Sequence, residues 1–373
     1  MKITKVEAML LRQPQIELVG DGSQDTVLIR VDTDEGICGY GEVDSNPYVV
    51  KQIIESPASH MACVGLAELI VGEDPMNPEV IWEKMYAKSI YYGRRSVVIH
   101  AMSGIDMAIW DIKGKALGVS VATLLGGRFR QRMEAYCSVL MPETDEQIQR
   151  LADRHLPKGY RGMKLGWGAL GQSAQKDIRL ARAARRALGP DKVLMLDIGM
   201  VWTDPKAALT ACRAFEEQDV FWVEEPFSPD ALDQYRALRE RVNLRIAGGE
   251  EVGTLWEYDQ LLRGGCVDIV QPDLSRCGGF TVARQLTTLA QLAGVQVVPH
   301  AFKTGVLMAA TLQYLASLPR ALWLEYCEQD TPLRRELTEQ HFPLNPDGTV
   351  DIPDEPGLGI AIDPKAILKY RIG

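Results

Sequence analysis

Eight short apolar runs recur along the chain, with 23 to 31 residues from the start of one run to the start of the next. Stretches between them, such as Ser173–Leu188 and Pro205–Gln218, have the pattern of amphipathic helices. The runs are Ala135–Leu140, Gly162–Leu165, Val193–Leu196, Val220–Val223, Leu244–Ala247, Val267–Val270, Val295–Val298 and Ala321–Leu324. Eight strands that alternate with helices over about 200 residues predict a (β/α)8 barrel. A doubly wound open sheet is the main alternative, but no Gly-x-Gly-x-x-Gly phosphate-binding turn follows any run.

An α+β module of roughly 125 residues is expected before the barrel. Ala101–Leu117 has the periodicity of a helix, and Gly118 stands where that helix would end. The tail from about residue 345 is rich in Pro, Gly and Asp, and we expect it to pack back on this module. Predicted strands of the module are Ile3–Leu11, Thr26–Asp32 and Ile37–Glu42. The predicted domains are residues 1–128, 129–344 and 345–373.

Charge and cysteine usage limit the classes of partner. The net charge of the 373-residue chain is −9, with both signs interspersed and no basic stripe, which disfavours nucleic acid and anionic membranes as partners. Seven scattered cysteines without a Cys-x-x-Cys pair are typical of reduced thiols in a cytoplasmic protein. The first ten residues read as a strand and not as a signal peptide, and no apolar run is long enough to span a membrane.

A charged or titratable residue lies in or just after seven of the eight runs. Because the carboxyl ends of barrel strands meet at one mouth, these side chains should converge there. They are Lys164, Asp197, Glu224, Glu250, Asp273, His300 and Glu325.

Each of these residues also has a purely structural interpretation. A single acidic residue after a strand is commonly a helix cap or a solvated loop charge, and we expect that role for Glu225 and Glu251. Lys164 alone could extend its ammonium to solvent, and His300 alone could be a buried histidine of the core. Taken together, however, the carboxylates would leave several unpaired negative charges at one barrel mouth.

Three of the carboxylates suit a metal ion. Asp197, Glu224 and Glu250 come from three consecutive strands, and no Cys or His lies beside them. Oxygen-only ligation favours a hard divalent cation, with Mg²⁺ preferred and Mn²⁺ second. Further along the barrel, Asp273 can orient His300 as a general base. Such a site could remove a proton from the carbon beside a carboxylate, because a metal ion and hydrogen-bond donors would stabilise the enediolate.

Several motifs resemble the mandelate racemase branch of the enolase superfamily (the mandelate racemase/muconate lactonizing enzyme family). They are Trp222-Val223-Glu224-Glu225-Pro226, Gly249-Glu250, Gln271-Pro272-Asp273 with Gly278-Gly279, Pro299-His300, Trp323-Leu324-Glu325 and the stretch from Ala101 to Lys115. The resemblance covers essentially the whole chain. It implies a modified (β/α)7β form of the TIM barrel, with an N-terminal α+β capping domain that the C-terminal tail completes.

The resemblance also implies roles for the candidate residues. Asp197, Glu224 and Glu250 would bind Mg²⁺, Asp273 and His300 would form the catalytic dyad, and Glu325 would contact the substrate carboxylate. Lys164 would add positive charge to the site. Loops near residues 15–25 and 45–60 would cover the barrel mouth and select the substrate. His60 and Arg95 are further substrate-binding candidates, with surface or packing roles as the alternative.

Two positions depart from the family pattern. Racemases of the family usually have Lys-x-Lys on the second strand, whereas this chain has Lys164-Leu165-Gly166, and the usual Asp-x-Asn is Asp197-Ile198-Gly199. A single base favours β-elimination, so the resemblance implies an Mg²⁺-dependent hydro-lyase, a dehydratase of a sugar acid (aldonate or aldarate). An epimerase or racemase that uses Lys164 or another residue as second base, and a non-catalytic barrel, are the alternatives. Such barrels commonly form dimers or octamers, so a homo-oligomer is expected.

Overall fold

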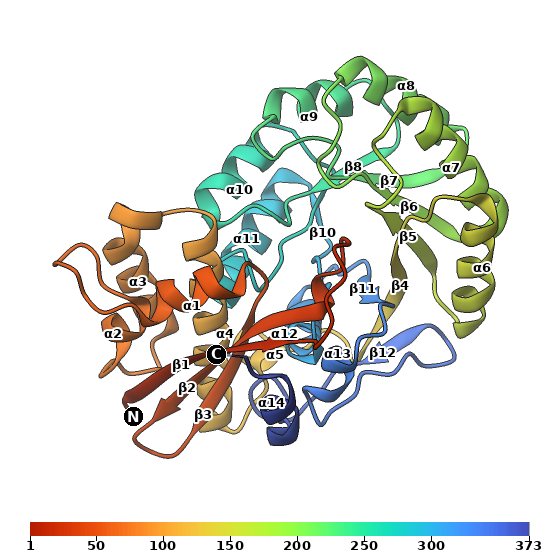
Figure 1. Cartoon of the computed structure of the whole chain (residues 1–373). Helices are drawn as coiled ribbons and strands as arrows, with labels where there is room; N and C mark the ends of the chain where they lie inside the picture. The colour runs from red at the N-terminus through yellow and green to blue at the C-terminus, as the bar shows by residue number, and fades with distance from the viewer. Residues whose placement is uncertain (373) are drawn as a thin grey trace.

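The N-terminal part of the chain is a three-stranded antiparallel sheet covered by helices (Figure 1). The computed structural model describes residues 1–372. The sheet pairs β1 (Ile3–Arg12), β2 (Asp25–Thr33) and β3 (Cys38–Val43) in chain order, which confirms the three predicted strands. The short helix η1 (Gly22–Gln24) precedes β2. The helices of this part are α1 (Pro47–Glu55), α2 (Leu66–Ile70), α3 (Pro78–Gly93), α4 (Val97–Leu117) and α5 (Val121–Leu124).

The predicted loop near residues 45–60 is wrong, because most of it is helix α1. The Asn46 side chain accepts a hydrogen bond from the Val49 amide, and Pro47 occupies the first turn, where its missing N–H costs nothing. Val50 and Ile54 lie on the buried face of the helix. These residues make a capped amphipathic helix that packs on β1.

The rest of the chain forms a parallel barrel. Each of the eight predicted runs overlaps a strand, although the run Ala321–Leu324 reaches only the first residue of its strand. Hydrogen-bonded neighbours follow the order β10-β9-β8-β7-β6-β5-β4-β11, each pair parallel. The strands are β4 (Arg132–Leu140), β5 (Gly162–Gly166), β6 (Val193–Asp197), β7 (Val220–Glu224), β8 (Arg245–Gly248), β9 (Ile269–Val270), β10 (Gln296–Val297) and β11 (Leu324–Cys327). The predicted modified barrel with an N-terminal α+β domain is confirmed.

Helices follow the strands and cover the outside of the barrel (Figure 1). Both helices expected from periodicity are present, with the Ser173 side chain capping the first of them. The bounds are α6 (Asp145–His155), η2 (Leu156–Lys158), α7 (Ala174–Leu188), α8 (Pro205–Glu216), α9 (Leu232–Arg239), α10 (Thr254–Arg263), α11 (Gly279–Ala293), α12 (Gly305–Ser317) and α13 (Pro332–Glu336).

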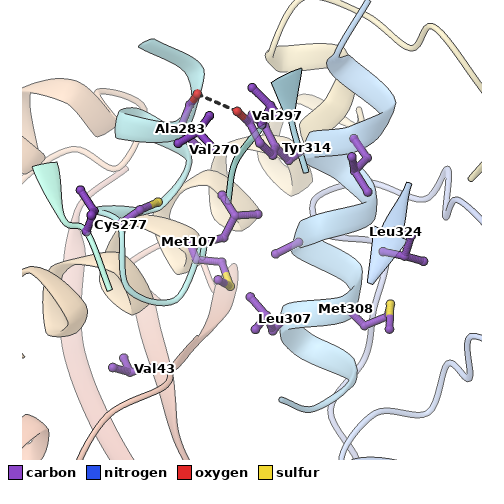
Figure 2. Close-up of a cluster of buried hydrophobic side chains, with 14 of the residues drawn as sticks. Val43, Met107, Val270, Cys277, Ala283, Val297, Leu307, Met308, Tyr314 and Leu324 are labelled. Carbon is purple, nitrogen blue, oxygen red and sulfur yellow. Dashed lines mark hydrogen bonds between the residues drawn. The ribbon is translucent and has the colours of Figure 1, made fainter. Parts of the chain in front are cut away.

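Helix α12 lies in the centre of the hydrophobic core. Figure 2 shows Leu307 and Met308 of this helix near Met107 of α4 and Leu324 of β11. Its Tyr314 hydroxyl donates a hydrogen bond to the carbonyl of Ala283 in α11 (3.0 Å). A helix that is apolar on almost every side is typical of a position between layers. None of the helices within residues 1–372 is long and apolar enough to cross a membrane.

The two parts of the fold meet at α4, which also supplies the 101–115 motif. Helix α4 crosses β3 so closely that a Cβ added at Gly41 would lie 1.9 Å from the Gly104 carbonyl oxygen. On the barrel side, Asp106 accepts hydrogen bonds from the amide and hydroxyl of Thr281 in α11 (3.0 and 2.5 Å). Trp110 donates its indole N–H to the same hydroxyl (3.0 Å). One helix therefore ties the N-terminal sheet to the barrel, and Gly118 ends it in a left-handed conformation, as predicted.

The C-terminal tail contacts both parts. Strand β12 (Thr349–Asp351) pairs antiparallel with β4 of the barrel. Helix α14 (Pro364–Tyr370) is followed by Arg371, which pairs with Leu11 of β1, and the Ile372 amide donates to the Leu10 carbonyl (2.9 Å). The exact domain limits of 128 and 344 stay a prediction.

Replacement of Asp106 should loosen the joint between α4 and α11. Asp106→Ala leaves the buried amide and hydroxyl of Thr281 without their acceptor, which costs about 2–4 kcal/mol. For a chain of this size we expect the melting temperature to fall by about 3–5 °C in differential scanning calorimetry. Asp106→Asn keeps one acceptor oxygen and should lose less. Equal melting temperatures for the alanine variant and the wild type would contradict this role.

Candidate active site

The barrel brings all seven predicted site residues to one mouth. Lys164 lies in β5, Asp197 and Glu224 end β6 and β7, and Glu325 lies in β11. Glu250, Asp273 and His300 follow β8, β9 and β10, and all seven side chains are buried. A cavity of about 250 Å³ opens among them. Its floor, formed by residues at strand ends, is made of Lys164, Asp197, Glu250, His300 and Glu325.

Asp197, Glu224 and Glu250 interact as like charges. The strand register places Asp197 directly beside Glu224. Burial, together with the Glu224 and Glu250 carboxylates, raises the pKa of Asp197 well above its usual value. Burial, Glu325 and Glu250 likewise raise the pKa of Glu224. No group of three or more His, Cys, Asp or Glu side chains within residues 1–372 already has metal-binding geometry. The mutual repulsion of three oxygen donors nevertheless fits a hard divalent cation.

The Lys164 ammonium supplies the positive charge among these carboxylates. It forms an ion pair with Glu224, and lies 2.8 Å from Glu325 Oε1 and 3.7 Å from Asp197 Oδ2. Burial opposes its charged form, but the surrounding carboxylates raise its pKa well above the usual value. Lys164 is therefore a buried cation of the site, and the interpretation of a solvent-directed lysine is wrong.

The other oxygen of Glu224 is held in place. Glu224 Oε2 accepts hydrogen bonds from the Trp222 indole N–H (3.0 Å) and from Gln271 Nε2 (2.8 Å). Both donors are buried at the inner side of the barrel. This carboxylate is therefore positioned before any ligand binds.

Glu225 is not a solvated loop charge or a helix cap, so that expectation is wrong. Its backbone has φ +40°, which turns the side chain away from Glu224 and into the protein. The carboxylate accepts hydrogen bonds from the Gly249 amide (2.6 Å) and the Tyr235 hydroxyl. Burial and Glu250 raise the pKa of Glu225 to about 8. Glu225 thus holds the backbone that precedes Glu250.

Asp273 and His300 form a hydrogen-bonded pair. His300 Nδ1 donates to Asp273 Oδ2 (2.7 Å), while Asp273 Oδ1 accepts from the amide and hydroxyl of Ser275 (2.7 and 2.5 Å). This arrangement leaves Nε2 as the basic atom. Nε2 lies 3.4 Å from Glu250 and 4.0 Å from Glu325. Burial disfavours the imidazolium, but Glu250, Glu325 and Asp273 raise the pKa of His300 to about 10.

Both carboxylate oxygens of Glu325 accept hydrogen bonds. Its Oε1 accepts from Ser138 Oγ (2.8 Å) and its Oε2 from the Ala301 amide (2.8 Å). Burial alone would raise its pKa, but Lys164 and His300 lower the pKa of Glu325 to about 2. The carboxyl group is therefore ionised in this arrangement. The expected contact with a substrate carboxylate would require a proton on Glu325 and stays a prediction.

Two cations near the mouth, Arg276 and Lys303, and their shared partner Asp44 were missed by the sequence analysis. Arg276 pairs with Asp44, with Glu251 (2.8 Å) and with Glu250 (3.5 Å). Lys303 lies 2.9 Å from Asp44 Oδ1 and donates to the Gly22 carbonyl (2.5 Å). The signal was their position three residues after Asp273 and three after His300. Both cations join the barrel to the N-terminal domain through Asp44.

The loop near residues 15–25 covers the mouth, as expected. Val19, Gly20, Asp21 and Gly22 line the cavity on the side opposite the strand ends. The Gln24 side chain ties this loop together by bonding the amide and carbonyl of Glu17 (2.7 and 2.9 Å). The second predicted segment contributes only its neighbour Asp44 to the cavity.

The two further candidates, His60 and Arg95, lie elsewhere. His60 is exposed and packs edge-on against Tyr91. Arg95 pairs with Glu257 (3.2 Å) and lies 5.5 Å from the ring centre of Trp256 in α10. Neither side chain lines the cavity, and Arg95 has a packing contact between the domains.

The two departures from the family pattern are structurally linked. A Cβ added at Gly166 would lie 2.7–2.8 Å from Cβ and Oδ2 of Asp197. Gly199 has φ +63°, and a Cβ there would lie 2.9 Å from the indole of Trp167. The space at these two strand ends is therefore occupied by the Asp197 carboxylate and the Trp167 ring. Glycine at positions 166 and 199 leaves room for these two groups.

Comparison with known proteins agrees with this arrangement. The description "Mandelate racemase / muconate lactonizing enzyme, N-terminal domain" matches residues 2–126, and "Enolase C-terminal domain-like" matches residues 146–366. D-galactarolactone cycloisomerase of Agrobacterium fabrum is 34% identical over 93% of this chain and 91% of its own length. Arabinonate dehydratase of Saccharolobus solfataricus is 29% identical over 95% and 93%.

A solved structure has the same overall fold. The crystal structure of the 3,6-anhydro-D-galactonate cycloisomerase from Zobellia galactanivorans superposes with a TM-score of 0.90 at 30% identity, covering 100% of both chains. The family match extends over both domains and includes all seven predicted site residues. The chain belongs to the mandelate racemase branch of the enolase superfamily.

Proposed function

We propose that the protein is an Mg²⁺-dependent dehydratase of a sugar acid, which removes the proton beside the carboxylate and eliminates the 3-hydroxyl. The observation that carries the proposal is the Asp273–His300 pair, whose histidine lines one cavity with Asp197 and Glu250, while Glu224 lies beside Asp197 in the neighbouring strand. Relatives named as dehydratases of arabinonate and D-galactonate support this class of reaction.

Asp197, Glu224 and Glu250 would hold the metal ion through their oxygens. Membership of the superfamily supports Mg²⁺ as this ion. When bound, the ion would neutralise the charge that develops on the substrate carboxylate as the enediolate forms.

His300 would move the protons. The carboxylate charge that favours the imidazolium would be offset by a metal ion bound at Glu250, and Nε2 of the neutral ring would then take the α-proton. Asp273 fixes the ring and stabilises the imidazolium that forms. The same Nε2–H then donates to the leaving 3-hydroxyl, so that water departs and an enol remains. The enol tautomerises to a 2-keto-3-deoxy acid. Lys164, already buried beside Glu224 and Glu325, would balance the negative charge of substrate and carboxylates.

The alternative, epimerisation or racemisation, needs a proton donor on the opposite face of the enediolate. Position 166 cannot supply it, because a Cβ there would contact the Asp197 side chain. Lys164 is held by ion pairs with two carboxylates. These contacts favour the one-base reaction.

A second candidate is ring opening of a cyclic sugar acid. Two full-length relatives are named as cycloisomerases. If the oxygen on the β-carbon belongs to a ring, the same proton removal and elimination break the ring and release no water. The product is then an isomer of the substrate.

A cytoplasmic homo-oligomer, dimer or octamer, is proposed on the sequence grounds given above.

The product in D₂O distinguishes these reactions. With Mg²⁺ and a panel of sugar acids and their lactones, we expect mass spectrometry to show a keto acid lighter than the substrate by one water. A keto acid of unchanged composition apart from deuterium would indicate ring opening. Recovery of substrate with an inverted, deuterated α-carbon would contradict elimination.

His300→Asn should remove the base and preserve the fold. Because general acid–base catalysis contributes roughly 10²–10⁴-fold, kcat should fall by at least that factor. The melting temperature and Mg²⁺ affinity, measured by calorimetry, should stay near those of the wild type. His341→Asn, at an exposed histidine outside the cavity, is the matched control. Activity retained in His300→Asn would exclude His300 as the base.

Glu250→Gln should weaken Mg²⁺ binding by at least about tenfold, because an anionic oxygen ligand becomes a neutral amide. Glu251→Gln is a matched control, since Glu251 is adjacent, is bound to Arg276 and does not line the cavity. Calorimetric titration with Mg²⁺ measures the affinity of each variant. Unchanged affinity in Glu250→Gln would show that the third ligand is Glu251 or lies elsewhere.

A further inference from the structure

The cavity has two chemically different ends. Its floor holds the charged residues at the strand ends, where the proposed reaction takes place. The opposite end consists of the capping loop and of side chains that rise beside it. These are Val19, Gly20, Asp21, Leu140, Trp167 and Phe302. A substrate whose carboxylate lies on the floor would extend its other end toward them.

The upper end has an apolar wall that one loop and two strand ends build. A Cβ added at Gly20 would lie 3.4 Å from the Trp167 indole and 3.6 Å from Leu140 Cδ2, so the loop rests directly on both side chains. Trp167 remains 38% exposed and lines the cavity. An indole face of this kind can contact the C–H face of a sugar chain or ring.

Asp21 is the charged group of this upper end. Its carboxylate accepts hydrogen bonds from the amide and hydroxyl of Ser23 (2.9 and 2.6 Å). Among the ion pairs found within residues 1–372, none includes Asp21, whereas Asp44 has both Arg276 and Lys303. Within the described residues, Asp21 therefore has no cationic partner.

The nearest cations are committed to other carboxylates. Arg276 binds Asp44, Glu250 and Glu251, and lies 3.9 Å from Asp273. Lys303 binds Asp44 and lies 3.4 Å from Asp25. A second carboxylate at the upper end of a substrate would meet Asp21, because the nearest cations, including Arg276 in the cavity wall, are already paired with Asp44. Like charges brought together at a binding site cost several kcal/mol.

We infer that the substrate is a monocarboxylate, an aldonate or its cyclic form, and that Asp21 together with the Trp167 wall excludes sugar diacids. This inference rests on the proposed function, because it assumes that a sugar-acid carboxylate occupies the floor. Asp21 acts as a specificity determinant: it can accept hydrogen bonds from terminal hydroxyls and repels a terminal carboxylate.

Matched acids test the inference. Each pentonate and hexonate is compared with the diacid of the same configuration, using Mg²⁺-loaded wild type for turnover and His300→Asn for calorimetric binding. For every acid turned over, we expect kcat/KM of the diacid to be lower by on the order of 100-fold. A diacid used as well as its monoacid would overturn the inference and leave the proposed function standing. If no acid is turned over or bound, the inference and the proposed function are both wrong.

A variant isolates the charge of Asp21. Asp21→Asn keeps an acceptor for Ser23 but removes the negative charge, so the monoacid-to-diacid ratio of kcat/KM should fall about tenfold. Asp363→Asn is the matched control, because Asp363 caps α14 through the same contact with the amide two residues on (2.8 Å), and lies outside the cavity. Its ratio should equal that of the wild type. An unchanged ratio in Asp21→Asn would overturn the assignment of Asp21.

Discussion

The repulsion among buried carboxylates at the barrel mouth is the interaction on which the other features of the structure depend. Asp197, Glu224 and Glu250 are buried together, and burial together with the neighbouring carboxylates raises the pKa of the first two. Buried charges of one sign are stable only with cations or protons beside them. Lys164 supplies one cation from inside the barrel, and a bound Mg²⁺ would supply a second. The proposed reaction depends on these buried carboxylates, because the cations that they hold would also stabilise an enediolate.

The same electrostatic requirement joins the two domains. Asp44, at the end of the N-terminal sheet, is buried between Arg276 and Lys303, and these cations lower its pKa despite its burial. Arg276 also contacts Glu250 and Glu251, so the capping domain, the candidate metal ligand and the dyad share one network. Lys303 also donates to the carbonyl of Gly22, so the position of the capping loop and the barrel charges are physically connected.

The sequence predicted the barrel and its strand ends because both depend on local patterns. Apolar runs such as Val220–Val223 mark buried strands. In a parallel barrel, a charged residue at the carboxyl end of such a strand lies at the mouth. Helix α1 was missed because its signals, Asn46 and Pro47, lie inside a segment dominated by strand patterns. Arg276 and Lys303 were missed because their partners are about 230 to 260 residues away in the chain, at Asp44.

Glu225 shows a different limit of sequence reasoning. Adjacent carboxylates look equivalent in a sequence, but a positive φ at Glu225 sends its side chain to the Gly249 amide while Glu224 stays at the mouth. Such a choice depends on backbone conformation that residue type does not reveal. The link between Gly166, Asp197, Trp167 and Gly199 is of the same kind, because only the packed strand ends show which side chain fills each space.

The binding stoichiometry of Mg²⁺ on the wild-type protein tests the central claim most directly. The account predicts saturable binding of one Mg²⁺ per chain in equilibrium dialysis, with Mn²⁺ competing for the same site and with a rise in melting temperature on binding. Absence of saturable binding of either ion to the folded protein would contradict it.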